Sequence, residues 1–320
     1  VLLTRRAGGA GSPPPPPPTA FIARQHQKRR SVLLEVAGTD PGLVLGPLAM
    51  MRSDPTMRLG RHEAIRATYT PEGPGVIRLT WGQQIGQLDV ESAGDGAAWL
   101  MEQAPRLIGA NDDVTVFTPG DPVVQRLWAH FKGDRVGATG TVWHDLAWTI
   151  TQQRVHRTDA ARQWRALVHA YGEPCEEVEG LYSPPDPERL ARAAPWALRA
   201  IGIDERRATT LIAAAQVAPR LHALADLPYV EAERGLRTIP GVGPWTLGCL
   251  SGFTWGNPDT VIPGDSGIPS LIASTLTGAR RADDSTMLEL LEPYRPHRYR
   301  VLRLALGEDR SHRPRPRLAA

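Results

Sequence analysis

The spacing of apolar residues changes about a third of the way along the chain. From Ser31 to about Val90, apolar and polar side chains alternate, whereas beyond Asp113 the apolar side chains recur every three or four residues. Alternation is typical of half-buried strands, and the longer spacing is typical of amphipathic helices. The sequence therefore predicts an α+β fold, with a small antiparallel sheet domain over residues 31–112 and an all-α region over residues 113–306.

Four segments of the first part are expected to be strands, and one is expected to be a helix. The middle two strands are separated by Pro71-Glu-Gly-Pro-Gly75, whose prolines and glycines favour a hairpin turn. We expect no catalytic residue in this part. The predicted strands are 32–36, 64–69, 76–81 and 85–90, and the predicted helix is 97–108.

The second part is expected to form about ten helices. Asp186 and Asp204 are best explained as N-caps, because a short polar side chain before an apolar-periodic run can accept the first free N–H groups. The expected helices are 123–131, 143–153, 158–171, a short one after Asp186, 205–217, two beside the turn at 240–243, and then 268–276, 286–291 and 296–306.

The turn between two of these helices has the sequence Pro240-Gly-Val-Gly243, followed by Pro244. Glycine adopts a positive φ without penalty, and proline suits the first turn of a helix, where its missing N–H costs nothing. Backbone N–H groups at such a helix N-terminus can hold a DNA phosphate without reading its base. An ordinary pair of helices with glycine in its turn would have the same pattern.

Asp265 lies 20 residues beyond Trp245, in Val261-Ile-Pro-Gly-Asp-Ser266 and just before the expected helix 268–276. We expect Asp265 to be the N-cap of that helix, where the helix dipole favours an ionised carboxylate. A cap without any chemical role is the alternative interpretation.

Leu236-x-x-Ile-Pro-Gly-Val-Gly-x-Trp-Thr246, followed at this distance by Asp265, resembles the helix-hairpin-helix superfamily of DNA glycosylases. Within that superfamily the chain is most similar to 3-methyladenine DNA glycosylase II. The resemblance covers residues 110–306. It extends to the predicted sheet region only through the length of that region and its alternating apolar pattern. It implies that the sheet is similar to half of a TATA-binding protein, that Asp265 is the catalytic carboxylate, and that the hairpin grips DNA through Pro240, Gly241, Val242, Gly243 and Thr246.

Thr151-Gln-Gln-Arg-Val155 lies between two expected helices and is predicted to be exposed. The resemblance implies that Gln153 faces the minor groove and that Arg154 fills the gap left by an extruded base. The best-known relative has an aliphatic residue at the position of Arg154, so this chain departs from it there. A solvated polar helix end is the alternative interpretation.

Trp245 occupies the position at which bifunctional members of the resembled superfamily carry a Schiff-base lysine. The chain has two lysines, Lys28 and Lys132, and neither is near the motif. A lyase needs an amine nucleophile, so we expect water to be the nucleophile here. Trp245 is expected to line the base pocket or to belong to the core, with Trp255 as a second candidate. Cys249 and Leu306 stand where the best-known relative has pocket aromatics.

Composition adds few constraints. The net charge is +3 and the sequence pI is about 9.1, which fits a polyanionic partner without proving one. Two cysteines cannot form a disulfide framework or a four-thiolate iron–sulfur cluster.

His144, His156 and His169 lack metal-ligand spacing and are predicted to be surface or packing residues. Asp259 is another carboxylate, but it lies in an expected turn, where Asp is favoured. We expect no cofactor, with a monovalent cation at the hairpin carbonyls left open.

Both ends of the chain are basic and carry little apolar sequence. Residues 1–30 include Arg5-Arg6, six consecutive prolines and Lys28-Arg-Arg30, and they lack the apolar core of a signal peptide. We expect this segment to be disordered, either as a basic arm near DNA or as an overextended gene start. Residues 307–320 are a basic tail. The longest apolar runs are shorter than the roughly 20 residues that cross a bilayer. A cytoplasmic monomer is therefore predicted.

The predicted function is that of a monofunctional DNA glycosylase of base excision repair. It would bind damaged double-stranded DNA, flip the base and hydrolyse the N-glycosidic bond of alkylated purines, foremost 3-methyladenine and 7-methylguanine. A glycosylase for another lesion such as hypoxanthine is one alternative, and a non-catalytic helix-hairpin-helix DNA-binding protein is another. An iron–sulfur endonuclease-type member is disfavoured by the cysteine count and the missing lysine.

Overall fold

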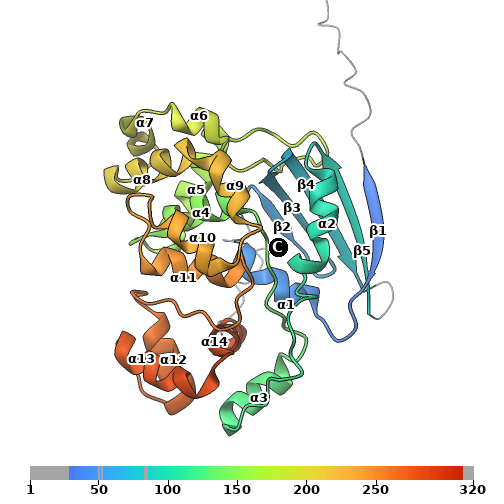
Figure 1. The fold of residues 1–320 in the computed structure, drawn as a ribbon, viewed down its shortest axis with the longest axis vertical. Helices are drawn as coiled ribbons and strands as arrows, with labels where there is room; N and C mark the ends of the chain where they lie inside the picture. Colours follow the sequence, from blue (N-terminus) through green and yellow to red (C-terminus); the bar gives the residue numbers. More distant parts are fainter. Residues whose placement is uncertain (1–28, 50, 52, 83–85, 313–320) are drawn as a thin grey trace, which may run out of the picture.

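The computed structural model describes residues 29–49, 51, 53–82 and 86–312. Predictions for residues 1–28 and 313–320 fall outside this part of the chain. Figure 1 shows three groups of elements: a twisted sheet, a large body of helices beside it, and a smaller group of helices that includes the C-terminal ones.

The N-terminal part is a five-stranded antiparallel sheet with the strand order β1-β5-β4-β3-β2. One face is covered by α2 (Ala97–Leu107), which buries Leu100 and Ala104 against strand residues such as Leu79 and Val90. The four predicted strands, the predicted helix and the hairpin turn after Thr70 are confirmed. The strands are β1 (Arg30–Glu35), β2 (Met57–Leu59), β3 (Glu63–Thr70), β4 (Gly73–Trp81) and β5 (Gln87–Gly94).

Three short elements were not predicted: α1 (Pro41–Leu45), the 3-10 turn η1 (Gly46–Leu48) and β2. They have only three to five residues, too few for a period to be seen. The carboxylate of Asp40 accepts the N–H groups of Gly42 and Leu43, so a local cap starts α1.

The larger helical body packs around α4, whose residues Leu146 and Ile150 are fully buried. Trp143 of α4 and Trp164 of α5 are among the largest buried side chains of this core. Two helices, α7 and α9, were not predicted because they have only six and seven residues, too few for a clear apolar period. The body comprises α4 (Val142–Gln152), α5 (Arg157–Tyr171), α6 (Pro187–Ala191), α7 (Pro195–Ala200), α8 (Glu205–Gln216), α9 (Ala218–Leu224), α10 (Tyr229–Leu236) and α11 (Pro244–Phe253).

A second, smaller core joins the first helix of the helical part to the last ones. Leu127 of α3 packs with Ile272, Leu291 and Val301, so chain segments far apart in sequence lie side by side (Figure 1). Its elements are α3 (Pro122–His130), α12 (Ile268–Thr277), α13 (Asp284–Leu291), η2 (Glu292–Tyr294) and α14 (Arg298–His312).

α11 belongs to both cores, because Leu247 and Leu250 are buried in the larger one and Cys249 in the smaller one. The N-terminus of α11 therefore lies where the two groups of helices meet.

A buried polar cluster fastens the sheet to α4. Arg66 of β3 forms an ion pair with Asp145 at 2.8 Å, and Thr68 lies 2.9 Å from Nδ1 of His144. The ring of His144 is buried and stacks on Trp164. A buried pair of this kind contributes little net stability because both charges lose their water, but it fixes one packing arrangement well when every member is bonded. His144 is a packing residue, in agreement with the prediction.

Candidate active site

The turn between α10 and α11 contains two glycines with different conformations. Gly241 has φ +86, and a Cβ there would collide with Thr210 of α8, so both the backbone and the packing require glycine. Gly243 has φ −116 with an extended ψ, and nothing lies within 4 Å of the position of its missing Cβ. The expectation of a positive φ is confirmed for Gly241 and is wrong for Gly243. The bare backbone of Gly243 faces open space instead.

Pro244 is the first residue of α11, as the sequence predicts. Gly243 precedes it as the N-cap residue and accepts the N–H of Leu247, which closes the first turn. The N–H groups of a helix's first turn have no acceptor earlier in the helix, and the helix dipole adds positive potential there. This end of α11 is therefore suited to an anion.

A cleft of about 1070 Å³ lies in front of this helix end. It is walled by five segments: the end of α4 with the start of α5, the start of α8, the hairpin, the loop before α12 and the start of α13. The lining side chains include Gln152, Gln153, Arg154, His156, Asp159, Asp204, Arg206, Arg207, Trp245, Thr246, Asp265, Ser266 and Asp284.

Asp265 lies on the cleft, half-buried, in the loop before α12. Its Oδ1 accepts the backbone N–H groups of Gly267 at 2.8 Å and Ile268 at 2.9 Å, while its Oδ2 accepts the indole N–H of Trp245 at 2.9 Å. The helix begins at Ile268 with Gly267 as its N-cap residue, so Asp265 caps from two residues further upstream than the sequence predicts. Trp245, predicted for the pocket or the core, lines the cleft and also packs on the smaller core.

Asp284 is a further carboxylate on the cleft wall, beside Asp159, Asp204 and Asp265, and it was not predicted from the sequence. Its Oδ2 accepts the backbone N–H of Gly264 at 2.8 Å, which ties the loop that carries Asp265 to α13. The only available signal was the pair Asp283-Asp284 before a helical run, and a cap explains it equally well.

The segment after α4 forms the opposite wall. The side-chain amide of Gln153 donates to the carbonyl oxygen of Gly241 at 3.1 Å and to Oγ1 of Thr246 at 2.9 Å. Arg154 follows it, exposed, with φ 57. Arg207 of α8, buried and also missed by sequence reasoning, donates to the backbone oxygen of Thr151 at 2.7 Å. The junction is therefore fixed both to the hairpin and to α8.

Three residues assigned to the base pocket from sequence lie elsewhere than the cleft wall. Cys249 is buried on α11, and burial together with the negative charge of Asp265 raises the pKa of its thiol. Leu306 packs in the smaller core, and the indole N–H of Trp255 donates to the backbone oxygen of Leu227 at 3.2 Å. Among the described residues that line the cleft, Trp245 is the one Trp, Tyr or Phe side chain. Cys249 and Leu306 pack in the smaller core instead.

Asp259 is occupied by an ion pair. Arg298 donates to it at 2.8 Å, and Arg295 lies 3.5 Å away. It joins the start of α14 to the preceding loop and does not line the cleft. It is therefore no rival to Asp265.

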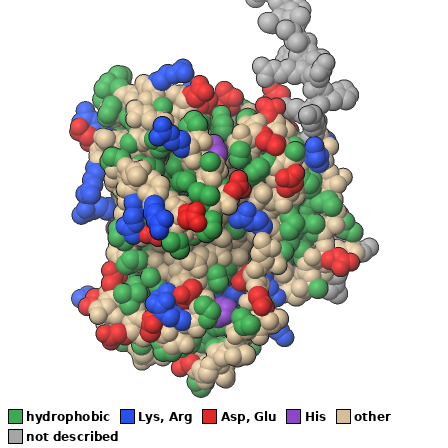
Figure 2. Space-filling view, in the orientation of Figure 1, with side chains coloured by type: hydrophobic (Ala, Val, Ile, Leu, Met, Phe, Trp, Pro, Cys, Tyr) green, Lys and Arg blue, Asp and Glu red, His purple; other side chains and the backbone are tan. Residues whose placement is uncertain are grey.

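Exposed arginines surround the cleft. Arg154 and Arg206 line it, and Arg234 and Arg237 are exposed on the hairpin side. Figure 2 shows several Lys and Arg side chains over the same side of the molecule as α8 and α10. The lining of the cleft is mixed in charge, because Asp159, Asp204, Asp265 and Asp284 lie on it together with Arg154, Arg206 and Arg207.

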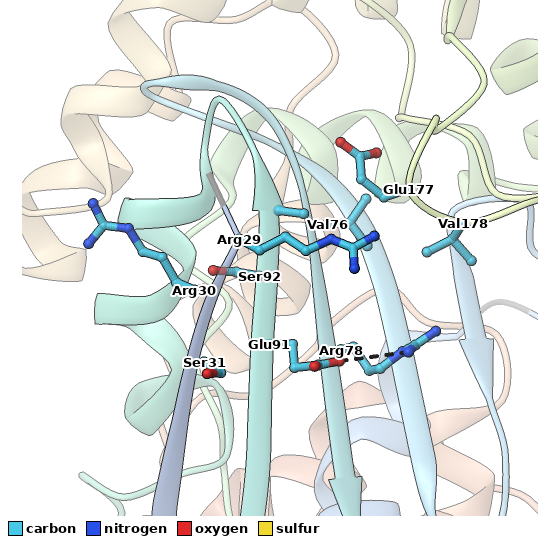
Figure 3. A pocket seen from close by; sticks show the side chains of 10 residues that line it. Arg29, Arg30, Ser31, Val76, Arg78, Glu91, Ser92, Glu177 and Val178 are labelled. Atoms are coloured by element: carbon cyan, nitrogen blue, oxygen red, sulfur yellow. Dashed lines mark ion pairs between the residues drawn. The ribbon is translucent and has the colours of Figure 1, made fainter. Parts of the chain in front are cut away.

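A second hollow, of about 170 Å³, lies on the outer face of the sheet, away from the cleft. Arg29, Arg78, Glu91 and Glu177 line it together with apolar side chains such as Val178 (Figure 3). Arg78 lies 3.7 Å from Glu91 and 3.4 Å from Glu63, so acidic side chains already face this cation. The hollow contributes nothing to the chemistry of the cleft.

Among the residues that the structure describes, no three His, Cys, Asp or Glu side chains are grouped as a metal site. The carbonyl of Gly241, one of the hairpin carbonyls considered for a monovalent cation, accepts a hydrogen bond from Gln153. None of the described helices is both long and apolar enough to cross a bilayer.

The described chain has an antiparallel sheet, then helices with a glycine-rich hairpin and an aspartate beyond it, and solved DNA glycosylases share this fold. The 3-methyladenine DNA-glycosylase from Archaeoglobus fulgidus superposes with a TM-score of 0.73 at 18% identity, over 88% of this chain and 99% of that one. An 8-oxoguanine glycosylase/lyase from Clostridium acetobutylicum gives a TM-score of 0.65 at 13% identity, over 89% and 97% of the two chains. Both likenesses concern the fold.

In sequence the chain is similar to proteins named DNA-3-methyladenine glycosylase. The chain is 30% identical over 174 residues to DNA-3-methyladenine glycosylase 2 of Escherichia coli (strain K12), covering 54% of this chain and 60% of that protein. It is 25% identical over 160 residues to DNA-3-methyladenine glycosylase of Bacillus subtilis (strain 168), covering 46% and 53%. The chain thus spans little more than half the length of these relatives. No protein-family model matches it.

Proposed function

We propose that this chain is a monofunctional DNA glycosylase that hydrolyses the N-glycosidic bond of alkylated purines in double-stranded DNA. The observation that carries the proposal is Asp265, whose carboxylate lies on a cleft whose other walls are a phosphate-binding type of hairpin and an arginine-bearing junction. The helical region, residues 113–306, would supply all of this chemistry, and the sheet region, residues 31–112, would support it. The relatives named above support the same activity class.

The hairpin would hold the DNA backbone. The open surface beside Gly243 lets a phosphate approach the first N–H groups of α11, and such contacts position the duplex without reading its sequence. Arg206 and Arg154 would add charge at the two flanks of the cleft. Arg154 would also enter the stack where the damaged nucleotide leaves it, since base excision requires the base to be taken out of the duplex.

Asp265 would act on the sugar once the base is in the cleft. As the bond between C1′ and the base nitrogen breaks, its electron pair leaves with the base and positive charge develops on the sugar. A fixed carboxylate stabilises that charge, and it assists the water that adds to C1′ by accepting its proton. Trp245 stands where a lyase would need an amine, so hydrolysis follows and not β-elimination.

Alkylated purines suit this site best. A purine alkylated at a ring nitrogen is cationic and leaves as a neutral base, so it needs little help from a general acid. The indole of Trp245 would attract such a base by a cation–π contact of about 0.5–2 kcal/mol. 3-Methyladenine and 7-methylguanine are therefore the proposed substrates.

The test incubates purified protein with methylated genomic DNA and identifies the released bases by chromatography. Wild-type protein is expected to release 3-methyladenine and 7-methylguanine. Asp265→Asn keeps the shape of the side chain but loses the charge and one of the two acceptor oxygens, and it is expected to be slower by roughly 10²-fold or more with unchanged or tighter DNA binding. Excision by Asp265→Asn at the wild-type rate would show that Asp265 is only a helix cap. Release of only 8-oxoguanine or oxidised pyrimidines would reassign the substrate, and release of no base would favour a DNA-binding protein without activity.

A further inference from the structure

Asp265 is held by donors from the N-terminal ends of two different helices. Trp245, in the first turn of α11, donates from its indole to Oδ2, and the N–H groups at the start of α12 donate to Oδ1. Because donors reach both oxygens, the carboxylate cannot rotate without losing at least one hydrogen bond. The indole is itself fixed, since its ring packs against the smaller core.

The chemical nature of the Trp245 donor matters for a carboxylate that must face a cation. An indole N–H donates one hydrogen bond, accepts none and carries no charge. A lysine in its place would donate too, but its positive charge would offset the charge of Asp265. The neutral donor fixes the group while leaving its full negative charge to act on the sugar.

We propose that Trp245 is a positioning residue for Asp265: its indole N–H sets the orientation of the carboxylate without neutralising its charge. This inference rests on the proposed glycosylase function and deepens it. It gives Trp245 a role distinct from stacking on the extruded base, because the N–H edge of the ring is engaged by Asp265 and only its faces remain for a base.

Trp245→Phe keeps an aromatic ring and removes the donor. We expect kcat for base release to fall by about 10- to 100-fold, the factor typical of a hydrogen bond to a charged group, with little change in KM. Trp255→Phe is the matched control, since its indole donates to a backbone oxygen away from the cleft and should leave both quantities unchanged.

Nuclear magnetic resonance of the indole groups tests the contact without any activity. Protein labelled with ¹⁵N at its nine tryptophans gives one indole signal per residue, and the signal lost in Trp245→Phe is that of Trp245. In Asp265→Asn this signal should move from its wild-type position, because the carboxylate oxygen that accepts the indole N–H is lost. If Trp245→Phe does not fold, the indole signal that moves in Asp265→Asn identifies the same contact.

The outcomes separate the two proposals. If wild-type protein releases no base, the proposed function fails whatever the indole signal does. If wild-type protein releases base but Trp245→Phe retains the wild-type kcat, the positioning role is overturned and the glycosylase proposal stands. If the indole signal of Trp245 has the same position in wild type and in Asp265→Asn, the positioning role is overturned as well.

Discussion

The side chain of Gln153, at the end of α4, is bonded to the hairpin: its amide lies 3.1 Å from the carbonyl oxygen of Gly241 and 2.9 Å from Oγ1 of Thr246. A residue expected to face the minor groove therefore joins the two elements proposed to hold DNA. This contact fixes the separation between the hairpin turn, which is proposed to bind a phosphate, and Arg154, the residue after Gln153.

Gln153→Ala removes both hydrogen bonds and should lower the free energy of unfolding by about 0.5–1.5 kcal/mol for each bond lost. The larger effect is expected in function, because a misplaced junction weakens both the DNA grip and base extrusion. Chemical denaturation and single-turnover excision measure the two effects. Gln152→Ala is the control, since Gln152 also lines the cleft but its amide lies 3.4 Å from the backbone oxygen of Trp148 on its own helix. Equal excision by the two variants would contradict the prediction.

The two hairpin glycines should respond differently to alanine. Gly241→Ala places a Cβ against Thr210 at a positive φ, so it should lower the melting temperature and DNA affinity together. Gly243→Ala meets no protein atom, so its melting temperature should stay at the wild-type value while its affinity for duplex DNA falls. Calorimetry and DNA-binding titrations measure both. Unchanged affinity in Gly243→Ala would show that no phosphate approaches this residue closely.

Sequence periodicity was sufficient for the main elements because each long helix or strand carries its own apolar stripe. The spacing from Trp245 to Asp265 likewise identified two residues that the structure brings to 2.9 Å. The sequence did not show which of the two hairpin glycines has a positive φ. One such residue, Gly241, is enough to make the turn, so the conformation of Gly243 could not be predicted. Asp284 and Arg207 were missed for a physical reason: their partners, Gly264 and Thr151, are distant in sequence, and only the packing of α13 and α8 brings them together.

Stability should fall as the solution becomes more acidic than about pH 6.5, and His144 should account for part of this. Burial, with the charge of Arg66 beside it, holds the pKa of His144 well below its ordinary value of 6.5. Below pH 6.5 the unfolded chain takes up a proton at this residue and the folded chain does not, so the folded state loses stability, by at most about 1.4 kcal/mol per pH unit for one group.

His144→Gln should therefore be less stable than wild type at pH 8 but should lose less stability between pH 7 and pH 5. Urea denaturation across this range measures the slope. His156→Gln, at an exposed histidine, is the control and should keep the wild-type slope. Burial also lowers the pKa of His222 and His297, so part of the slope should persist in His144→Gln. Identical slopes in wild type and His144→Gln would show that His144 does not contribute.

No covalent enzyme–DNA species is expected after borohydride reduction, and no strand cleavage by β-elimination. The reason is that the lyase position holds Trp245, and the chain has two lysines, one of which, Lys132, lies outside the cleft. Reduction during turnover on methylated DNA, followed by denaturing electrophoresis, measures both products. A trapped adduct would overturn the assignment as a monofunctional enzyme. Trp245→Lys offers a useful comparison, because it introduces an amine at that position.

Arg154 has φ 57, and it is the one non-glycine residue with a positive φ in the described part of the chain. An L-residue in this region costs about 1 kcal/mol or more, and asparagine tolerates it better than most. Arg154→Asn should therefore unfold no more easily than wild type, and should gain up to about 1 kcal/mol. A residue kept at such a cost on the cleft wall suggests that its position matters for function.

If Arg154 fills the space left by the extruded nucleotide, Arg154→Asn should excise alkylated bases more slowly despite its equal or greater stability. The loss should be largest when the lesion lies in a fully paired duplex, because extruding a paired and stacked base costs the most. With the same lesion opposite an abasic site, where less pairing must be broken, the variant should recover much of the wild-type rate. Single-turnover excision on the two duplexes gives this ratio directly. A loss of equal size on both would assign Arg154 to phosphate binding instead, and no loss on either would leave its strained backbone without a role in base extrusion.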